Sequence, residues 1–188
     1  MGAGKTGKWL SYQHCGADVH PDMVTMGKSI SGGMYPVSYI LGADEVMSSV
    51  GSFEVAATYA FTPPGIAAVK VALEVFDEEN LVERAAHLGE LYLHTVSGWN
   101  SPLIEFATAC GADIGIETKP DSGASPRKVT ALCMNKGLHV FPGKTRIRMS
   151  VPMIITDEDF LRRLGMLKEA LDEADHYSDL EGEHWDAL

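Results

Sequence analysis

A lysine at the end of a short apolar run is the residue best suited to chemistry in this chain. Met23–Met26 has the length and composition of a buried strand, Gly27 ends it, and Lys28 follows at once. Gly32–Gly33 then interrupts the chain. A lysine held between glycines at the mouth of a strand can present its amine to a carbonyl compound, and it becomes a Schiff-base nucleophile when burial or neighbouring charges lower its pKa. An exposed lysine that merely ends a strand is the alternative interpretation.

Two other patterns near this lysine predict no site. Gly27–Ser29 resembles the end of a phosphate-binding loop, but Asp22 stands where that motif requires its first glycine. His14, Cys15 and His20 do not have the spacing of a usual metal site. We therefore expect neither a nucleotide phosphate loop nor a bound metal ion.

Composition and charge exclude several classes of function. The chain has 188 residues, of which 45% are hydrophobic, and a formal net charge of −11, which argues against nucleic acid or an anionic membrane as partner. No apolar run approaches the about 20 residues of a membrane span, and the first residues lack the apolar segment of a signal peptide. The three cysteines show no CxxC spacing and are typical of reduced thiols. We therefore expect a cytoplasmic protein.

The first half of the chain predicts two short strands and two helices. The strands cover 23–26 and 37–41, on either side of the Lys28 loop, and Pro63–Pro64 begins the first helix. Asp77–Asn80 interrupts it, and a second helix continues to about Trp99. Each helix carries apolar residues at helical spacing, which should form buried faces. They are Ile66, Val69, Leu73 and Phe76 in the first helix, and Leu81, Ala85, Leu88 and Tyr92 in the second.

From Asn100 onward, shorter elements alternate. Strands are predicted at 103–107, 114–117, 139–141 and 146–151. Ser125 is typical of a helix N-cap because a proline follows it, and Gly137 suits the left-handed end of that helix. Thr156 caps a last helix. The apolar residues expected to be buried in these two helices are Val129, Leu132 and Cys133, and Phe160, Leu164, Leu167 and Leu171.

The alternation of strands and helices indicates an α/β or α+β fold. Residues 1–99 are predicted to form part of an α/β domain that ends in a long linking helix. Residues 100–176 are predicted to form a small α+β domain, and residues 177–188 an acidic tail.

The motifs around the lysine resemble the class III aminotransferases that depend on pyridoxal phosphate, and within that family the ornithine aminotransferases. They are Lys5–Trp9, Pro21–Asp22, Gly27–Ser38, Ala57–Tyr59, Ala72–Leu81 and Ile147–Arg148. They span most of the chain in the same order, which a chance motif would not do. The resemblance implies the C-terminal part of a fold-type I pyridoxal-phosphate transferase, with a truncated large α/β domain followed by a small C-terminal domain.

The resemblance also implies roles for single residues. Lys28 matches the lysine that forms the Schiff base with the cofactor and then moves the 1,3-proton. Thr58 matches a threonine that binds the cofactor phosphate of the neighbouring subunit. Arg148 matches the arginine that holds the substrate carboxylate with its two-pronged guanidinium, and Arg146 is the second candidate for that role.

Several departures from the family pattern limit these implications. The chain resembles a little over two fifths of the family's length, from just after the motif whose aspartate pairs with the pyridine nitrogen of the cofactor. Phe61 stands where the family usually has glycine after the phosphate-binding threonine. We therefore do not expect this chain to bind pyridoxal phosphate tightly by itself.

Three hypotheses follow from the resemblance and its gaps. The chain could act in amino-group transfer between an amino acid and an oxo acid, completed by an N-terminal half or a partner. It could instead be a non-catalytic binding or regulatory subunit of an aminotransferase. It could also be a repurposed enzyme that uses Lys28 on a small carbonyl substrate without the cofactor. A sheet reduced to a few strands leaves an uncovered edge and face, so we expect a homo-oligomer, or a hetero-oligomer with a longer aminotransferase chain.

Overall fold

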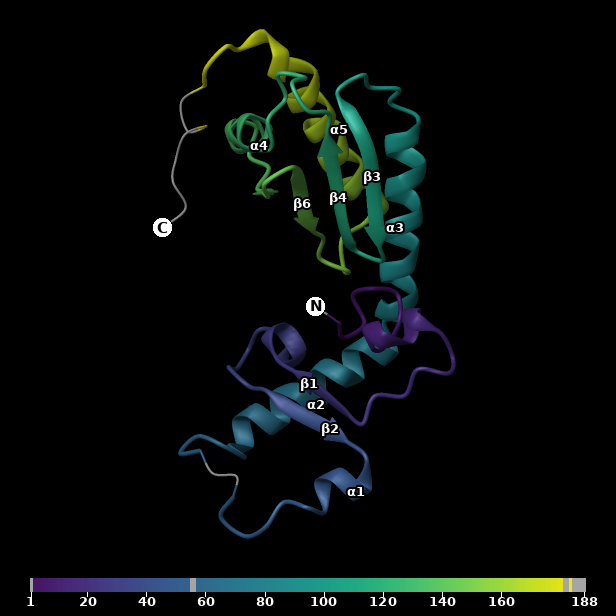
Figure 1. Cartoon of the computed structure of the whole chain (residues 1–188), viewed down its shortest axis with the longest axis vertical. Helices are drawn as coiled ribbons and strands as arrows, with labels where there is room; N and C mark the ends of the chain where they lie inside the picture. Colours follow the sequence, from purple (N-terminus) through teal and green to yellow (C-terminus); the bar gives the residue numbers. More distant parts are fainter. Residues whose placement is uncertain (1, 55–56, 181–182, 184–188) are drawn as a thin grey trace. The chain divides into compact units, whose positions relative to one another are not determined.

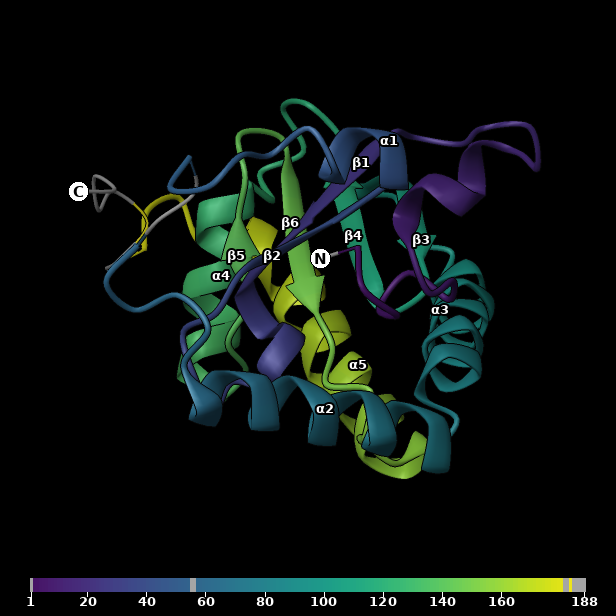
Figure 2. The same ribbon diagram turned by 90° about the horizontal axis from the view of Figure 1, so that it is seen from below.

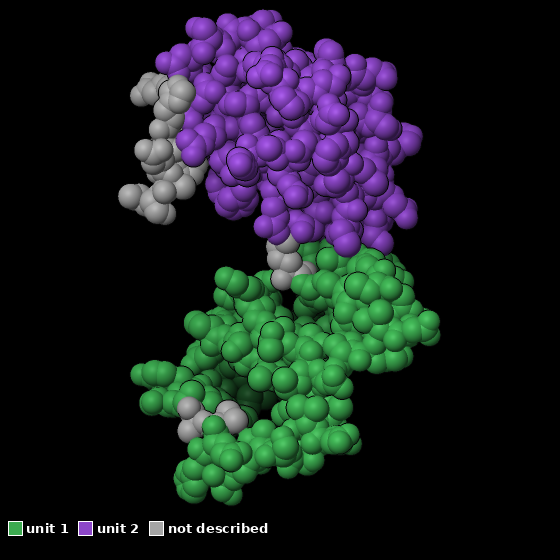
Figure 3. All heavy atoms as spheres, viewed as in Figure 1, with its two compact units in different colours: residues 1–83 green, residues 84–188 purple. Residues whose placement is uncertain are grey.

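The chain folds into two compact units. The computed structural model describes residues 2–54, 57–180 and 183. The first unit is Met1–Glu83 and the second is Arg84–Leu188 (Figure 3). The division falls inside the long helix α3 (Leu81–Ser97), most of which belongs to the second unit. The domain boundaries predicted from the sequence at 99/100 and 176/177 stay a prediction.

The first unit is built around a two-stranded antiparallel sheet. Its strands β1 (Met23–Met26) and β2 (Tyr39–Gly42) pair with Met23 opposite Gly42 and Met26 opposite Tyr39. The predicted strand at 23–26 is therefore confirmed, and the second strand begins two residues later than predicted. The remaining elements of this unit are η1 (Ser11–Cys15), η2 (Lys28–Ser31), α1 (Asp44–Met47) and α2 (Pro63–Glu78) (Figure 1).

Helix α2 has the predicted start but not the predicted burial. Pro63 and Pro64 occupy its first turn, where a missing N–H leaves no carbonyl unpaired. Ile66 and Leu73, expected in the buried face, are 49% and 45% exposed. The prediction of a fully buried stripe is therefore wrong for these two residues. The physical reason is that, in the described part of this unit, α2 packs against the short helix η2 and, through Phe76, against Trp9, which leaves part of its apolar face uncovered.

The second unit is a four-stranded antiparallel sheet covered on one side by helices. The strand order is β3-β4-β6-β5. The strands are β3 (Ile104–Cys110), β4 (Asp113–Thr118), β5 (Phe141–Pro142) and β6 (Arg146–Ser150). Figure 2 shows α3, α4 (Pro126–Asn135) and α5 (Asp157–Glu173) on the same side of this sheet. A short helix, η3 (Ala174–His176), follows α5.

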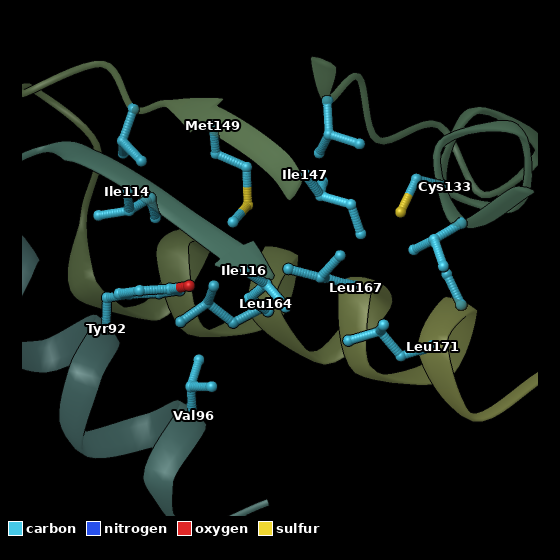
Figure 4. Close-up of a cluster of buried hydrophobic side chains, with 14 of the residues drawn as sticks. Tyr92, Val96, Ile114, Ile116, Cys133, Ile147, Met149, Leu164, Leu167 and Leu171 are labelled. Carbon is cyan, nitrogen blue, oxygen red and sulfur yellow. The ribbon is translucent and has the colours of Figure 1, made fainter. Parts of the chain in front are cut away.

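The hydrophobic core of the second unit lies between the sheet and these helices (Figure 4). Strand β6 alternates, with Ile147 and Met149 buried and the residues between them exposed. The helix faces predicted to be buried are buried. Tyr92 and Leu88 of α3, and Leu167 and Leu171 of α5, have no exposed surface. Burial of this kind is the main favourable contribution to folding, so this unit has the core of an independent domain.

The predicted helix ends are confirmed in the second unit. The Ser125 side chain accepts a hydrogen bond from the Lys128 backbone N–H at 3.1 Å, and Thr156 accepts one from the Asp159 N–H at 3.1 Å. Gly137 has φ +81°, the left-handed conformation that ends α4. None of the described helices is long and apolar enough to cross a membrane.

Candidate functional site

Lys28 lies at the turn that leaves strand β1. Gly27 is extended, with φ −167°, and Lys28, the first residue of η2, has φ +64°. A left-handed backbone costs a residue with a side chain about 1–2 kcal/mol. Strain of this kind persists where the surrounding structure fixes it, and it is frequent at functional sites. The Lys28 side chain is exposed, so its amine is accessible from the surface of the first unit.

The loop after Lys28 is held by Ser31. This serine is only 1% exposed; its Oγ donates a hydrogen bond to the Tyr35 carbonyl at 2.6 Å and accepts one from the Tyr35 N–H at 3.3 Å. Gly32 and Gly33 have φ +64° and +80°, and these left-handed conformations let the chain turn tightly between Ser31 and Tyr35. The glycines and the serine therefore fix the far end of the loop that carries the amine.

Helix α2 packs against the same loop. Gly65 is buried, and a Cβ at this position would lie 3.1 Å from a ring carbon of Tyr35. A Cβ on Gly32 would lie 3.9 Å from the Cβ of Ala72, which is ordinary contact. The helix thus approaches the Lys28 loop closely enough that a larger residue at position 65 would displace Tyr35.

A cavity of about 540 Å³ in the first unit opens beside the lysine. Its lining includes β1, Gly27–Ile30 and the segment Leu10–Tyr12. Lys28 is the only charged residue among the described residues that line it. The cavity can therefore take a small carbonyl compound against the amine, and its described lining adds neither a carboxylate nor a second cation.

Thr58 is exposed in a turn of the same unit. The Ala60 N–H donates a hydrogen bond to the Ala57 carbonyl across this turn, at 3.0 Å. Thr58 does not line the cavity beside Lys28. Phe61, where the family pattern predicts glycine, has φ +57° and is 82% exposed. The backbone at position 61 thus keeps a conformation that glycine adopts more readily.

Arg148 lies on the open face of the sheet in the second unit. It pairs with Gly115 of β4 in the register, and its neighbour on that face, Arg146, pairs with Glu117. The Arg148 Nε is 3.2 Å from one carboxylate oxygen of Asp113, and a terminal nitrogen is 3.4 Å from the other. The guanidinium therefore already contacts a carboxylate with both prongs, the geometry in which it would hold a carboxylate ligand.

The predicted residues are divided between the units. Lys28 and Thr58 belong to the first unit, and Arg148 belongs to the second. Sequence reasoning missed Ser31 and Asp113. Ser31 stands directly before two glycines, where a hydroxyl that closes a turn is common. Asp113 could have been found only by placing Ile147–Ser150 beside Asp113–Ile116, because the contact depends on strand register.

The described residues contain no group of three or more His, Cys, Asp or Glu side chains placed to hold a metal ion. No disulfide is recorded: Cys15 and Cys110 are exposed and Cys133 is buried. The predicted site residues offer an amine and a hydroxyl in the first unit and a guanidinium in the second.

Comparison with known proteins gives a consistent result. The family model described as aminotransferase class-III matches residues 1–171. The ornithine aminotransferase of Emericella nidulans is 37% identical over 175 residues, which are 92% of this chain and 38% of that protein. That of Schizosaccharomyces pombe is 34% identical, over 92% of this chain and 40% of that protein.

Solved structures agree with the sequence comparison. The ornithine aminotransferase from Toxoplasma gondii matches with a TM-score of 0.85 at 26% identity, over 94% of this chain and 42% of that one. An acetylornithine aminotransferase from Elizabethkingia anophelis matches with a TM-score of 0.83 at 29% identity, over 92% of this chain and 45% of that one. The chain spans about two fifths of the length of the curated relatives it matches.

Proposed function

Because the chain belongs to the class III aminotransferase family, we propose that it carries the lysine-bearing part of an ornithine-aminotransferase-like site. In this proposal it acts in amino-group transfer between an amino acid and an oxo acid when another polypeptide segment completes the site. The observation that carries the proposal is the exposed amine of Lys28, held by a left-handed backbone beside a cavity of about 540 Å³. The family match and the truncated span support it.

The residues around the cavity fit pyridoxal phosphate in part. An accessible amine suits the aldehyde of the cofactor. A pyridinium nitrogen needs an acidic partner, and a phosphate needs cations or a cluster of N–H donors. Lys28 is the only charged residue among the described residues that line the cavity. We therefore expect the ring nitrogen and the phosphate to be bound by groups outside this chain's cavity.

Three residues of this chain would take distinct roles in the completed site. Pyridoxal phosphate, when bound, supplies the electron sink for the reaction. The Lys28 Nζ would hold the cofactor through its aldehyde, with loss of water, and once displaced by the substrate amine the free Nζ would carry a proton from the substrate carbon and return it. Arg148 would orient the substrate through its carboxylate, in competition with Asp113. Thr58, which is exposed, would donate its hydroxyl to the cofactor phosphate of a neighbouring subunit.

The uncovered surface of the first unit supports assembly with another chain. Met34, Phe53, Tyr59 and Phe61 are all more than four fifths exposed, and both strands of the hairpin carry exposed apolar residues. Large apolar side chains exposed in this number suggest a surface that another chain covers. We propose a homo-oligomer, or a hetero-oligomer with a longer aminotransferase chain. A monodisperse monomer in light scattering at micromolar concentration would overturn that part of the proposal.

Covalent trapping tests the role of Lys28. The purified chain, alone and mixed with the N-terminal portion of a class III aminotransferase, is incubated with pyridoxal phosphate, reduced with borohydride and mapped by peptide mass. We expect a pyridoxyl group on Lys28, with higher occupancy in the mixture. Lys28→Ala should remove it, whereas Lys70→Ala, which replaces an exposed lysine of α2, should not. Labelling spread over surface lysines in both samples, and unchanged by Lys28→Ala, would overturn the proposal.

A non-catalytic subunit is the second candidate. The observation that favours it is the scarcity of charged groups around the cavity. The same mixture separates the two functions. Transaminase activity with ornithine that is lost in Lys28→Ala supports catalysis, whereas a partner that binds equally well to Lys28→Ala and has unchanged activity supports a scaffold role.

A further inference from the structure

The C-terminal tail contacts the second unit at a buried lysine. The family match ends at residue 171, so the segment after it is a feature of this chain rather than of the family model. Two residues of that segment bind at the start of α4. The Tyr177 carbonyl accepts a hydrogen bond from the Lys128 Nζ at 2.8 Å, and a Glu183 carboxylate oxygen accepts one from the Ser125 hydroxyl at 2.7 Å.

Lys128 is unusual because its ammonium group is buried. Its side chain is 8% exposed, and that of Glu183 is 13% exposed. The Nζ donates two hydrogen bonds to carbonyl oxygens, of Gly123 at 3.0 Å and of Tyr177 at 2.8 Å, and lies 3.9 Å from the second carboxylate oxygen of Glu183. Neutral carbonyls satisfy donors but leave the charge uncompensated. Glu183 is therefore the counter-ion that makes burial of this lysine tolerable.

The surroundings of Glu183 are positive. Ser125 is the N-cap of α4: its hydroxyl accepts from the Lys128 N–H and donates to Glu183, so the cap and the tail share one side chain. The first turn of a helix carries partial positive charge, which favours a carboxylate there. A cavity of about 570 Å³ at this place is lined by Arg127 and Lys144, and Glu183 is the only acidic residue among its described lining residues.

We propose that the described tail residues, 177–180 and 183, act as a strap that is closed by Glu183 as the counter-ion of Lys128. The closed strap joins the tail at Tyr177 to the loop at Gly123 and the start of α4, which directly follows that loop. Opening the strap exposes the Lys128 amine together with the positive pocket at the start of α4. The tail is then a switchable part of the second unit, and this role is independent of the proposed amino-group transfer.

Amine reactivity measures the state of the strap. The full chain and Glu183→Gln are pulsed with an acetylating N-hydroxysuccinimide ester, and acetylation of Lys128 is followed by peptide mass. Removing one partner of a buried ion pair leaves the other charge uncompensated, so we expect Lys128 to react about tenfold faster in Glu183→Gln. Glu169→Gln is the matched control, because Glu169 is 66% exposed and pairs with Lys136 in the same unit. It should leave the reactivity of Lys128 unchanged.

The same samples show whether the strap opens locally. Cys133 is fully buried in the core of the second unit, and its alkylation reports unfolding of that unit. We expect Glu183→Gln to raise the reactivity of Lys128 while Cys133 stays protected. Equal Lys128 reactivity in the full chain and Glu183→Gln would overturn the proposal. A parallel rise at Lys128 and Cys133 would overturn it as well, because it would indicate general unfolding instead of an opened strap.

Discussion

Replacing Tyr92 by phenylalanine should lower the free energy of unfolding of the second unit by about 1–3 kcal/mol. The Tyr92 ring has no exposed surface, and its hydroxyl donates a hydrogen bond to the Gly115 carbonyl at 2.7 Å. Phenylalanine keeps the buried ring but removes the hydroxyl, so the Gly115 carbonyl loses this hydrogen bond in the protein interior. Gly115 is also the register partner of Arg148, so the same bond fixes the strand position opposite the proposed substrate-binding arginine.

The expected change is large enough to measure by thermal unfolding. For a domain of this size, 1 kcal/mol corresponds to about 4–8 °C in Tm, so the expected loss of about 1–3 kcal/mol should lower the Tm of Tyr92→Phe by about 4–24 °C. Tyr59→Phe is the matched control, because Tyr59 is 81% exposed and its hydroxyl can be hydrated in both states. Its Tm should change by no more than about 2 °C. A Tyr92→Phe protein that melts with the wild type would refute the reasoning.

Alkaline pH provides a second measurement on the same variant. Burial raises the pKa of Tyr92, because the phenolate is disfavoured in the core. The resulting contribution to stability is fully present below the unfolded-state pKa of about 10 and is lost as the pH rises above it. The stability of Tyr92→Phe should therefore fall less steeply above about pH 10 than that of the wild type. If the stability of the two proteins fell equally steeply above about pH 10, the loss could not be assigned to ionisation of Tyr92.

Three further changes test single features of the chain. Gly89→Ala should destabilise the second unit by about 1–3 kcal/mol in urea unfolding, because a Cβ there would lie 2.6 Å from a backbone oxygen of the β3–β4 turn. Gly165→Ala, in α5 with open space around it, should instead stabilise by about 0.5–1 kcal/mol, and equal effects would contradict the packing argument. Phe61→Gly should relieve about 1–2 kcal/mol of left-handed strain, partly offset by chain entropy, and a lower Tm would contradict this. Burial raises the pKa of Cys133 to about 12, so iodoacetamide at pH 8 should modify the two exposed cysteines and spare Cys133 until the unit unfolds.

Short-range signals in the sequence predicted most of the second unit. Ser125 and Thr156 act as N-caps because a hydroxyl three residues before a helical N–H is already in reach. Tyr92 and Leu167 are buried because apolar residues at helical spacing share one face, and the sheet offers that face a surface to cover. Such signals need no knowledge of distant parts of the chain.

Contacts between distant segments could not be predicted in the same way. Asp113 reaches Arg148 only because β4 and β6 pair in one particular register. The left-handed backbone of Lys28 lies where β1 gives way to η2, and a lysine gives no local sign of it in the sequence. The burial predicted for Leu73 was wrong for a different reason: helical spacing indicates an apolar face but not what covers it.

The difference between the two units bears on which partner would suit the proposed assembly through the first unit. In the second unit three helices cover one face of the sheet, whereas Met34, Tyr59 and Phe61 of the first are 81%, 81% and 82% exposed. Burying one large apolar side chain contributes about 1.5–3 kcal/mol, and association itself costs an estimated 4–15 kcal/mol. Covering these three side chains alone would therefore roughly balance the cost of association. A stable complex also has to cover the exposed face of α2, which favours an extensive surface, such as the rest of an aminotransferase fold or a second copy of the chain, over a short peptide.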